Sequence, residues 1–147
     1  MLDSTVASHM VSNSEAIRAA SHDAHRVAQS SDFVRELFRG TLPRERYAPY
    51  VRQLHGVYEV SEAAGHALLD DPVAGTFARM GLDRTARIEA DLCTLAGDGW
   101  REAIPLSAGT QAYRTHVAEA CFSWPAGYVA HHYVRYMGDL SGGQHIR

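Results

Sequence analysis

The sequence contains no lysine and only two cysteines, Cys93 and Cys121. A phosphate-binding loop requires a Gly-Lys-Ser/Thr ending, so the absence of lysine excludes that kind of nucleotide site. The two cysteines lie far apart and form no CxxC pair, which favours reduced thiols in a cytoplasmic protein over a disulfide framework. We expect both to be small buried apolar residues.

Charge of one sign and long hydrophobic runs are also scarce. All fourteen basic residues are arginine and the formal net charge is −3, so no broad basic field indicates a nucleic-acid partner. No uncharged stretch is long and apolar enough to cross a bilayer, and the N-terminus lacks the basic-then-apolar order of a secretory signal. We therefore expect a soluble, cytoplasmic protein without a membrane partner.

The composition supports one ordinary domain, because 46% of the 147 residues are hydrophobic. Residues 1–12 are polar, serine-rich and without periodicity, and Ser8-His9-Met10 resembles a cloning scar. We predict that residues 1–12 are disordered or tag-derived and that residues 13–147 form the domain.

Apolar residues recur at helical spacing along most of the chain, and no segment alternates with the period of a strand. This pattern predicts an all-α fold of five or six helices with short connections, between which ligands tend to bind. The expected helices are residues 14–29 (capped by Asn13 or Ser14), 32–39 (capped by Ser31, followed by Gly40), about 47–68, 83–97 (capped by Asp83), one after a Ser107 cap, and one opened by Pro125.

The most unusual segment is residues 135–144, where three glycines occur within a helical pattern. Each glycine lowers the stability of a helix by about 1 kcal/mol relative to alanine. Gly138 and Gly142 are four positions apart and share one helix face, where bare backbone would let a flat ligand approach closely. The alternative is that Gly142 and Gly143 simply end the helix.

This segment, Arg-Tyr-Met-Gly-Asp-Leu-Ser-Gly-Gly-Gln, closely resembles the distal-helix motif of haem oxygenases. The resemblance extends in the same order over nearly all of residues 15–147, but the family's C-terminal third is absent. It implies an all-α, haem-oxygenase-like fold that holds haem between its first helix and a glycine-kinked distal helix. Further matching segments are residues 16–25, 31–35, 54–58 and 100–105.

For activity, the resemblance implies cleavage of haem b to biliverdin, carbon monoxide and ferrous iron, with haem as both substrate and cofactor. The reaction consumes molecular oxygen and external electrons. No flavin or nicotinamide motif occurs in the chain, so a separate reductase, or a ferredoxin- or flavodoxin-type protein, would supply the electrons.

The resemblance makes His25 the proximal ligand of the iron. Arg18 precedes it by seven residues, hence within about 20° of one line along the helix and roughly 10 Å away, so its planar guanidinium would reach a haem propionate. Gln29 follows by one turn and would hydrogen-bond the second ring nitrogen of His25, where many family members carry glutamate. Without the resemblance, a structural histidine and a solvated arginine are the alternatives.

On the distal side, the resemblance makes Asp139 the anchor of a water network that delivers protons to oxygen at the iron. Its alternative is an ordinary charge at a helix end, and aromatic residues at helical spacing are core residues more often than not. The remaining predicted site residues are Gly138, Gly142, Gly143 and Ser141 against the macrocycle, and Tyr58, Tyr133 and Arg135 near the water network or the haem edge.

Three other hypotheses stay open. The chain is a haem-binding module without turnover, or a truncated fragment of a haem oxygenase that binds haem weakly and exposes apolar surface. A thiamine-hydrolysing relative would need a cysteine nucleophile, and neither Cys93 nor Cys121 has a supporting motif.

Overall fold

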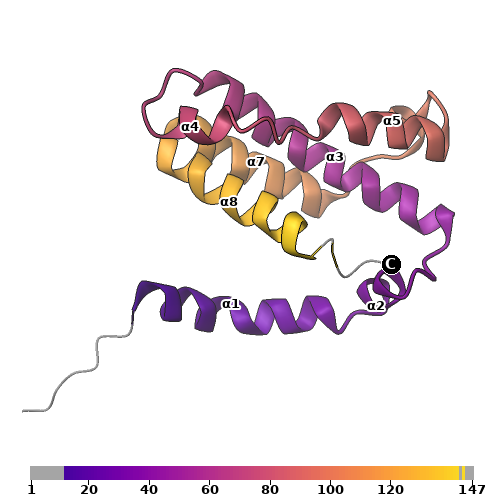
Figure 1. Cartoon of the computed structure of the whole chain (residues 1–147). Coiled ribbons are helices and arrows are strands. Elements are labelled where there is room, and N and C mark those ends of the chain that lie inside the picture. Colours follow the sequence, from indigo (N-terminus) through magenta and orange to yellow (C-terminus); the bar gives the residue numbers. More distant parts are fainter. Residues whose placement is uncertain (1–11, 143, 145–147) are drawn as a thin grey trace, which may run out of the picture. The chain divides into compact units, whose positions relative to one another are not determined.

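The computed structural model describes residues 12–142 and 144, and every regular element in these ranges is a helix (Figure 1). The all-α prediction is confirmed, with eight helices in the described residues instead of five or six. The additional short helices, α4 and α6, are too brief to produce a periodic pattern. The helices are α1 (Asn13–Gln29), α2 (Asp32–Phe38), α3 (Arg44–Ala67), α4 (Ala74–Ala78), α5 (Thr85–Ala96), α6 (Trp100–Ala103), α7 (Ala108–Ser123) and α8 (Pro125–Gly142).

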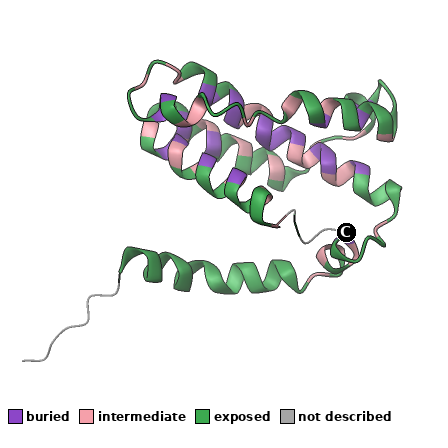
Figure 2. Cartoon of the chain, viewed as in Figure 1, coloured by how far each residue is buried: buried purple, intermediate pink, exposed green. Residues whose placement is uncertain are grey.

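The chain divides into two compact units, of which the first ends at Thr41 and the second begins at Leu42. In the first unit, Ser12 caps α1, and Glu15 completes the reciprocal pair of bonds known as a capping box. The predicted cap at Asn13 or Ser14 is therefore wrong by one or two positions. No residue of α1 is buried, and Figure 2 shows it exposed along its length.

The second helix has the ends that its sequence predicts. The Ser31 side chain accepts a hydrogen bond from the backbone N–H of Val34, and Gly40 follows the helix at φ +65°. A positive φ at this position suits glycine, which has no Cβ to clash. Leu37 is the buried residue of α2, whereas Phe38 is 39% exposed.

In the second unit, α3 is the central helix and contacts α4, α5, α7 and α8. Its buried positions are drawn in purple in Figure 2. Two hydrophobic clusters pack around it, each joining residues distant in sequence. The first cluster is Val51, Tyr58, Ile88, Leu92, Trp100 and Tyr136, and the second is Ala64, Ala74, Val117, Cys121 and Tyr128.

The last two helices also begin as predicted. Ser107 accepts a bond from the N–H of Thr110 at 3.1 Å, and Pro125 opens α8, where its missing N–H leaves no bond unmade. Close packing needs glycine at Gly127, because an added Cβ would lie 2.7 Å from the Ala120 carbonyl oxygen. No helix in residues 12–142 has the length and apolar character needed to span a bilayer.

Candidate functional site

The glycine face of α8 is open in the second unit. Gly138 lies inside a helix that runs unbroken from Pro125 to Gly142, and an added Cβ at either Gly138 or Gly142 would meet nothing within 4 Å. Neither glycine has a positive φ. Val134, one turn before Gly138 on the same face, is 69% exposed. The backbone here is therefore bare toward open space, and Gly142 is also the last helical residue.

Asp139 lies beside this face and is held by three donors, one from α3, one from the residue before α5 and one from α8 itself. The Tyr58 hydroxyl of α3 and the Nη1 of Arg84, which precedes α5, both donate to Oδ2. The Nη2 of Arg135 donates to Oδ1 at 3.0 Å, one turn back along α8. The Asp139 side chain remains 20% exposed. The carboxylate is thus fixed in orientation while one edge stays accessible.

Tyr58 is fully buried at this cluster. Burial, together with the hydrogen bond to Asp139, raises the pKa of Tyr58 to about 12, so the phenol is neutral at physiological pH and acts as a donor. Burial is the largest influence on the pKa of Arg135 and lowers it, but the hydrogen bonds and charges of Asp139 and Tyr58 together outweigh burial, so the net shift is upward. The guanidinium carbons of Arg84 and Arg135 lie 5.4 and 5.6 Å from the centre of the Tyr58 ring.

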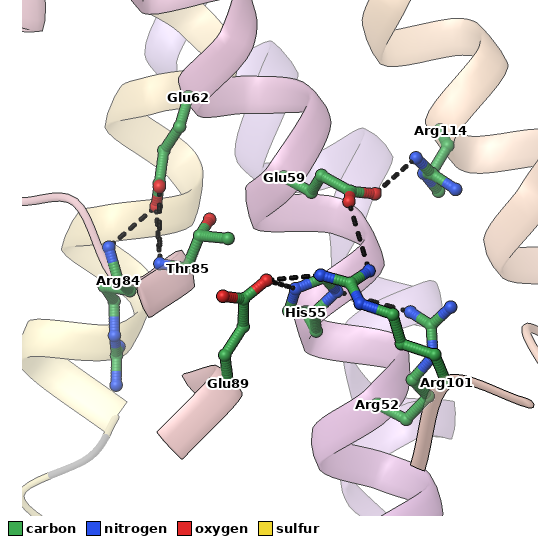
Figure 3. Close-up of polar contacts among 9 residues, drawn as sticks. All are labelled: Arg52, His55, Glu59, Glu62, Arg84, Thr85, Glu89, Arg101 and Arg114. Atoms are coloured by element: carbon green, nitrogen blue, oxygen red, sulfur yellow. Dashed lines mark hydrogen bonds and ion pairs between the residues drawn. The ribbon is translucent and has the colours of Figure 1, made fainter. Parts of the chain in front are cut away.

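A second carboxylate, Glu62 of α3, caps the start of α5. Glu62 Oε1 accepts the backbone N–H groups of Arg84 at 2.7 Å and Thr85 at 3.2 Å (Figure 3). The Tyr136 hydroxyl donates to the same oxygen at 3.2 Å. The predicted cap at Asp83 is therefore wrong. Asp83 instead bonds to His66 at 2.9 Å, since a carboxylate from another helix already satisfies the free N–H groups.

These contacts form one connected cluster across α3, α5 and α8. The Tyr58 and Tyr136 rings meet edge to face, with centroids 5.4 Å apart at 64°. The sequence alone could have placed Glu62 near Tyr58, because it follows Tyr58 by four residues on the same face of α3. The sequence could not have paired Arg84 with Asp139, because the two residues lie 55 positions apart. We call the group formed by Tyr58, Glu62, Arg84, Arg135, Tyr136 and Asp139 the Asp139 cluster.

A separate polar network surrounds His55, which is fully buried (Figure 3). Its Nδ1 lies 3.3 Å from Arg52 Nη1 and its Nε2 lies 3.0 Å from Glu89 Oε1. Because arginine only donates, Nδ1 accepts and the ring proton sits on Nε2, where it bonds to Glu89. The Trp100 ring packs edge to face on His55 at 4.9 Å. This network ties α3 to α5 and α6.

The predicted proximal residues all lie on α1 and are exposed: Arg18, His25 and Gln29. Their helical placement keeps the spacing expected from the sequence. No hydrogen bond joins Gln29 to His25 in the part of the chain that the structure describes. Within the same part, no three His, Cys, Asp or Glu side chains gather around a common point. The roles of these three residues stay predictions.

The other predicted contacts fall on or just after α8. Tyr133 is 61% exposed and Ser141 is exposed. Gly143 lies outside the described residues. The structure thus brings together Tyr58, Arg135 and Asp139 and leaves the glycine face open beside them.

Fold and site define an all-helical protein whose glycine-bearing helix carries a carboxylate held by a buried tyrosine and two arginines. Residues 12–147 match the family model described as heme oxygenase. The chain belongs to the haem oxygenase family.

Known relatives agree with this assignment. Heme oxygenase 1 of Rattus norvegicus is 35% identical over 135 residues, which cover 91% of this chain and 47% of the relative. Heme oxygenase 1 of Synechocystis sp. is 32% identical over 131 residues, 89% of this chain and 55% of the relative. The chain therefore spans about half the length of these curated relatives.

Solved structures show the same fold. The crystal structure of Synechocystis heme oxygenase-1 in complex with heme superposes with a TM-score of 0.76 at 32% identity, covering 88% of this chain and 58% of that one. Heme oxygenase from Leptospira interrogans gives a TM-score of 0.76 at 31% identity, covering 86% of this chain and 62% of the other.

Proposed function

We propose that this chain binds haem b and, with molecular oxygen and an external electron donor, cleaves it to biliverdin, carbon monoxide and ferrous iron. The observation that carries the proposal is the Asp139 carboxylate, held by Tyr58, Arg84 and Arg135 at the edge of a bare helix face. Haem supplies the iron that activates oxygen and the carbon that is oxidised. The protein supplies binding, orientation and proton handling.

The residues present fit a flat macrocycle. The space over Gly138 and Gly142 is open, so a planar ring can approach the main chain to contact distance. The exposed Val134 extends the same face with apolar surface. At its edge, the Nε of Arg135 is buried and has no hydrogen-bond partner among the described residues, so the cluster has capacity for a further acceptor.

Asp139 and Tyr58 have complementary tasks in this proposal. An ionised carboxylate accepts hydrogen bonds only, so Asp139 orients water by taking one of its protons. The Tyr58 hydroxyl donates to Asp139, and its raised pKa keeps it protonated. Water held in this way would be a source of protons at the edge of the macrocycle, while the carboxylate itself stays in place. Tyr133 and Ser141 are proposed to border the macrocycle, together with Gly143.

From the resemblance to the family, we propose that His25 would hold the iron of haem and that Arg18 would pair with a propionate. Both lie on one line of α1, and neither side chain is buried in its own unit. Gln29, one turn beyond His25, is proposed to hold the second imidazole nitrogen. A neutral amide there would leave the imidazole less anionic than a glutamate would.

The test is a single-turnover spectrum. Haem-loaded protein given a reductant and oxygen is expected to lose its Soret band and gain the broad red absorption of a bilin. A Soret band that persists under these conditions identifies the chain as a haem-binding module without turnover. Electron transfer from a ferredoxin- or flavodoxin-type donor is then tested by replacing the chemical reductant with the candidate protein and its reductase.

A further inference from the structure

We propose that Arg84 is a positioning residue for Asp139, which occupies Oδ2 together with Tyr58 and thereby makes Oδ1 the oxygen that anchors water. This inference rests on the proposed function and deepens it. It concerns a side chain outside the glycine motif, contributed by the start of a different helix.

The first step is the number of hydrogen bonds at the carboxylate. Each carboxylate oxygen has two lone-pair directions. At Oδ2 both are used, by the Tyr58 hydroxyl and by Arg84 Nη1 at 2.5 Å. At Oδ1 one is used, by Arg135 Nη2 at 3.0 Å. One direction remains, on Oδ1, and the Asp139 side chain as a whole is 20% exposed.

The second step is what holds Arg84 in place. Its backbone N–H donates to Glu62 at 2.7 Å, and the Tyr136 hydroxyl donates to the same carboxylate. Residue 84 is the N-cap of α5 and makes no cap bond with its own side chain. The Arg84 guanidinium is therefore available to bond Asp139 of α8, while Glu62 of α3 holds the Arg84 backbone.

The third step is the charge around the carboxylate. Arg84 and Arg135 both form ion pairs with Asp139, so two positive charges face one negative charge. Arg84 is 44% exposed, so solvent screens part of its effect. Without Arg84, a lone-pair direction opens on Oδ2 and water has two competing anchors instead of one. The expected result is slower proton delivery with unchanged haem binding.

The first experiment uses haem-loaded protein and compares Arg84→Gln, Arg84→Lys and Arg87→Gln. Arg87 is exposed in the first turn of α5, three residues after Arg84, and serves as the matched control. We expect Arg84→Gln to slow single-turnover bilin formation about tenfold, the size usual for residues that orient a functional group. The Kd for haem should change by less than about twofold. Arg84→Lys should recover most of the rate because it keeps the charge, and Arg87→Gln should match the unsubstituted chain.

The second experiment needs no haem. Thermal unfolding of the haem-free chain is measured for Arg84→Gln, Asp139→Asn and the double variant. Glutamine keeps the backbone N–H that bonds Glu62, so α5 retains its capped start. If the two side chains are paired, the double variant loses no more in Tm than the larger single loss, because either substitution already removes the contact.

The outcomes separate the two claims. Three results would each overturn the positioning role. The first is an unchanged rate of bilin formation in Arg84→Gln, and the second is a rate in Arg84→Lys as slow as in Arg84→Gln. The third is a loss of Tm in the double variant equal to the sum of the two single losses. If the unsubstituted chain forms no bilin at all, the proposed function fails, and the unfolding cycle still decides whether Arg84 holds Asp139.

Discussion

The Tyr58 hydroxyl donates a hydrogen bond to Asp139 Oδ2, although the two residues lie 81 positions apart in the chain. The phenol comes from the buried face of α3 and the carboxylate from the edge of the open face of α8. This bond joins the core of the second unit to the surface where haem is proposed to bind. Substitutions in and around the Asp139 cluster can therefore be tested for their effects on stability and on haem binding or turnover separately.

Replacing Asp139 with asparagine keeps the shape of the side chain and removes its charge. We expect haem binding to persist and bilin formation to fall about 100-fold, the lower end of the contribution of positioned proton-transfer groups. The measurement is single-turnover absorption spectroscopy of the haem-loaded protein. Asp91→Asn, at an exposed position of α5, is the control and should behave as the unsubstituted chain. Equal rates for both variants would remove Asp139 from the proton path.

Replacing His25 with alanine tests the proximal assignment, because it deletes the proposed axial bond and keeps a good helix former. We expect the Soret maximum of the ferric protein to shift and the Kd for haem to rise about 100-fold, which corresponds to roughly 2.7 kcal/mol. His22→Ala, on the same exposed helix, is the matched control. A normal spectrum in His25→Ala and an altered one in His22→Ala would move the ligand to His22.

Replacing Gly138 with alanine should change stability and haem binding in opposite directions. Nothing lies within 4 Å of the added Cβ and the residue is helical, so the haem-free protein should gain about 0.5–1 kcal/mol in unfolding free energy. The same methyl group should weaken haem binding if the macrocycle contacts this face. Urea unfolding and haem titration measure the two effects.

Gly127→Ala is the comparison variant. Its Cβ would lie 2.7 Å from the Ala120 carbonyl oxygen, so this substitution should destabilise the packing of α7 against α8. If Gly138→Ala binds haem as tightly as the unsubstituted chain, the glycine face is not the ligand surface.

The stability of the chain should fall in strongly alkaline solution. The pKa of Tyr58 is about 12 in the folded protein and about 10 when unfolded, so the folded state binds this proton more tightly. Stability from this difference is fully present below about pH 10 and is lost as the pH rises through 12. Burial and Glu62 also raise the pKa of Tyr136, and burial raises that of Tyr128 to about 12.

The measurement is the urea midpoint between pH 8 and 11.5. Tyr58→Phe should be less stable at pH 8, where it lacks the bond to Asp139, and should lose stability less steeply above pH 10. Tyr47→Phe, at a position 38% exposed, should keep the original slope. Identical slopes in the Tyr58→Phe and unsubstituted chains would show that Tyr58 does not couple its ionisation to folding.

Glu62→Gln should destabilise the chain by about 1–3 kcal/mol, because the buried charge that caps α5 and accepts from Tyr136 is lost. Chemical unfolding gives the difference. Glu102→Gln removes an exposed charge and should stay within about 0.5 kcal/mol of the unsubstituted chain. A loss of the same small size at both positions would show that other groups satisfy the start of α5.

The sequence by itself determined the helical class, several helix ends and the family. Ser31, Ser107 and Pro125 begin their helices as predicted, because a cap depends on residues within one turn of it. The ten-residue glycine motif likewise lies in one continuous segment, so it is readable without any fold.

Only the tertiary structure decided which side chains meet. Glu62, not Asp83, caps the start of α5, and Arg84 meets Asp139 because α5 and α8 both pack against α3. Such contacts depend on the packing of large side chains between helices, which sets how each helix is placed and rotated. Residue spacing along one helix carries no information about that rotation.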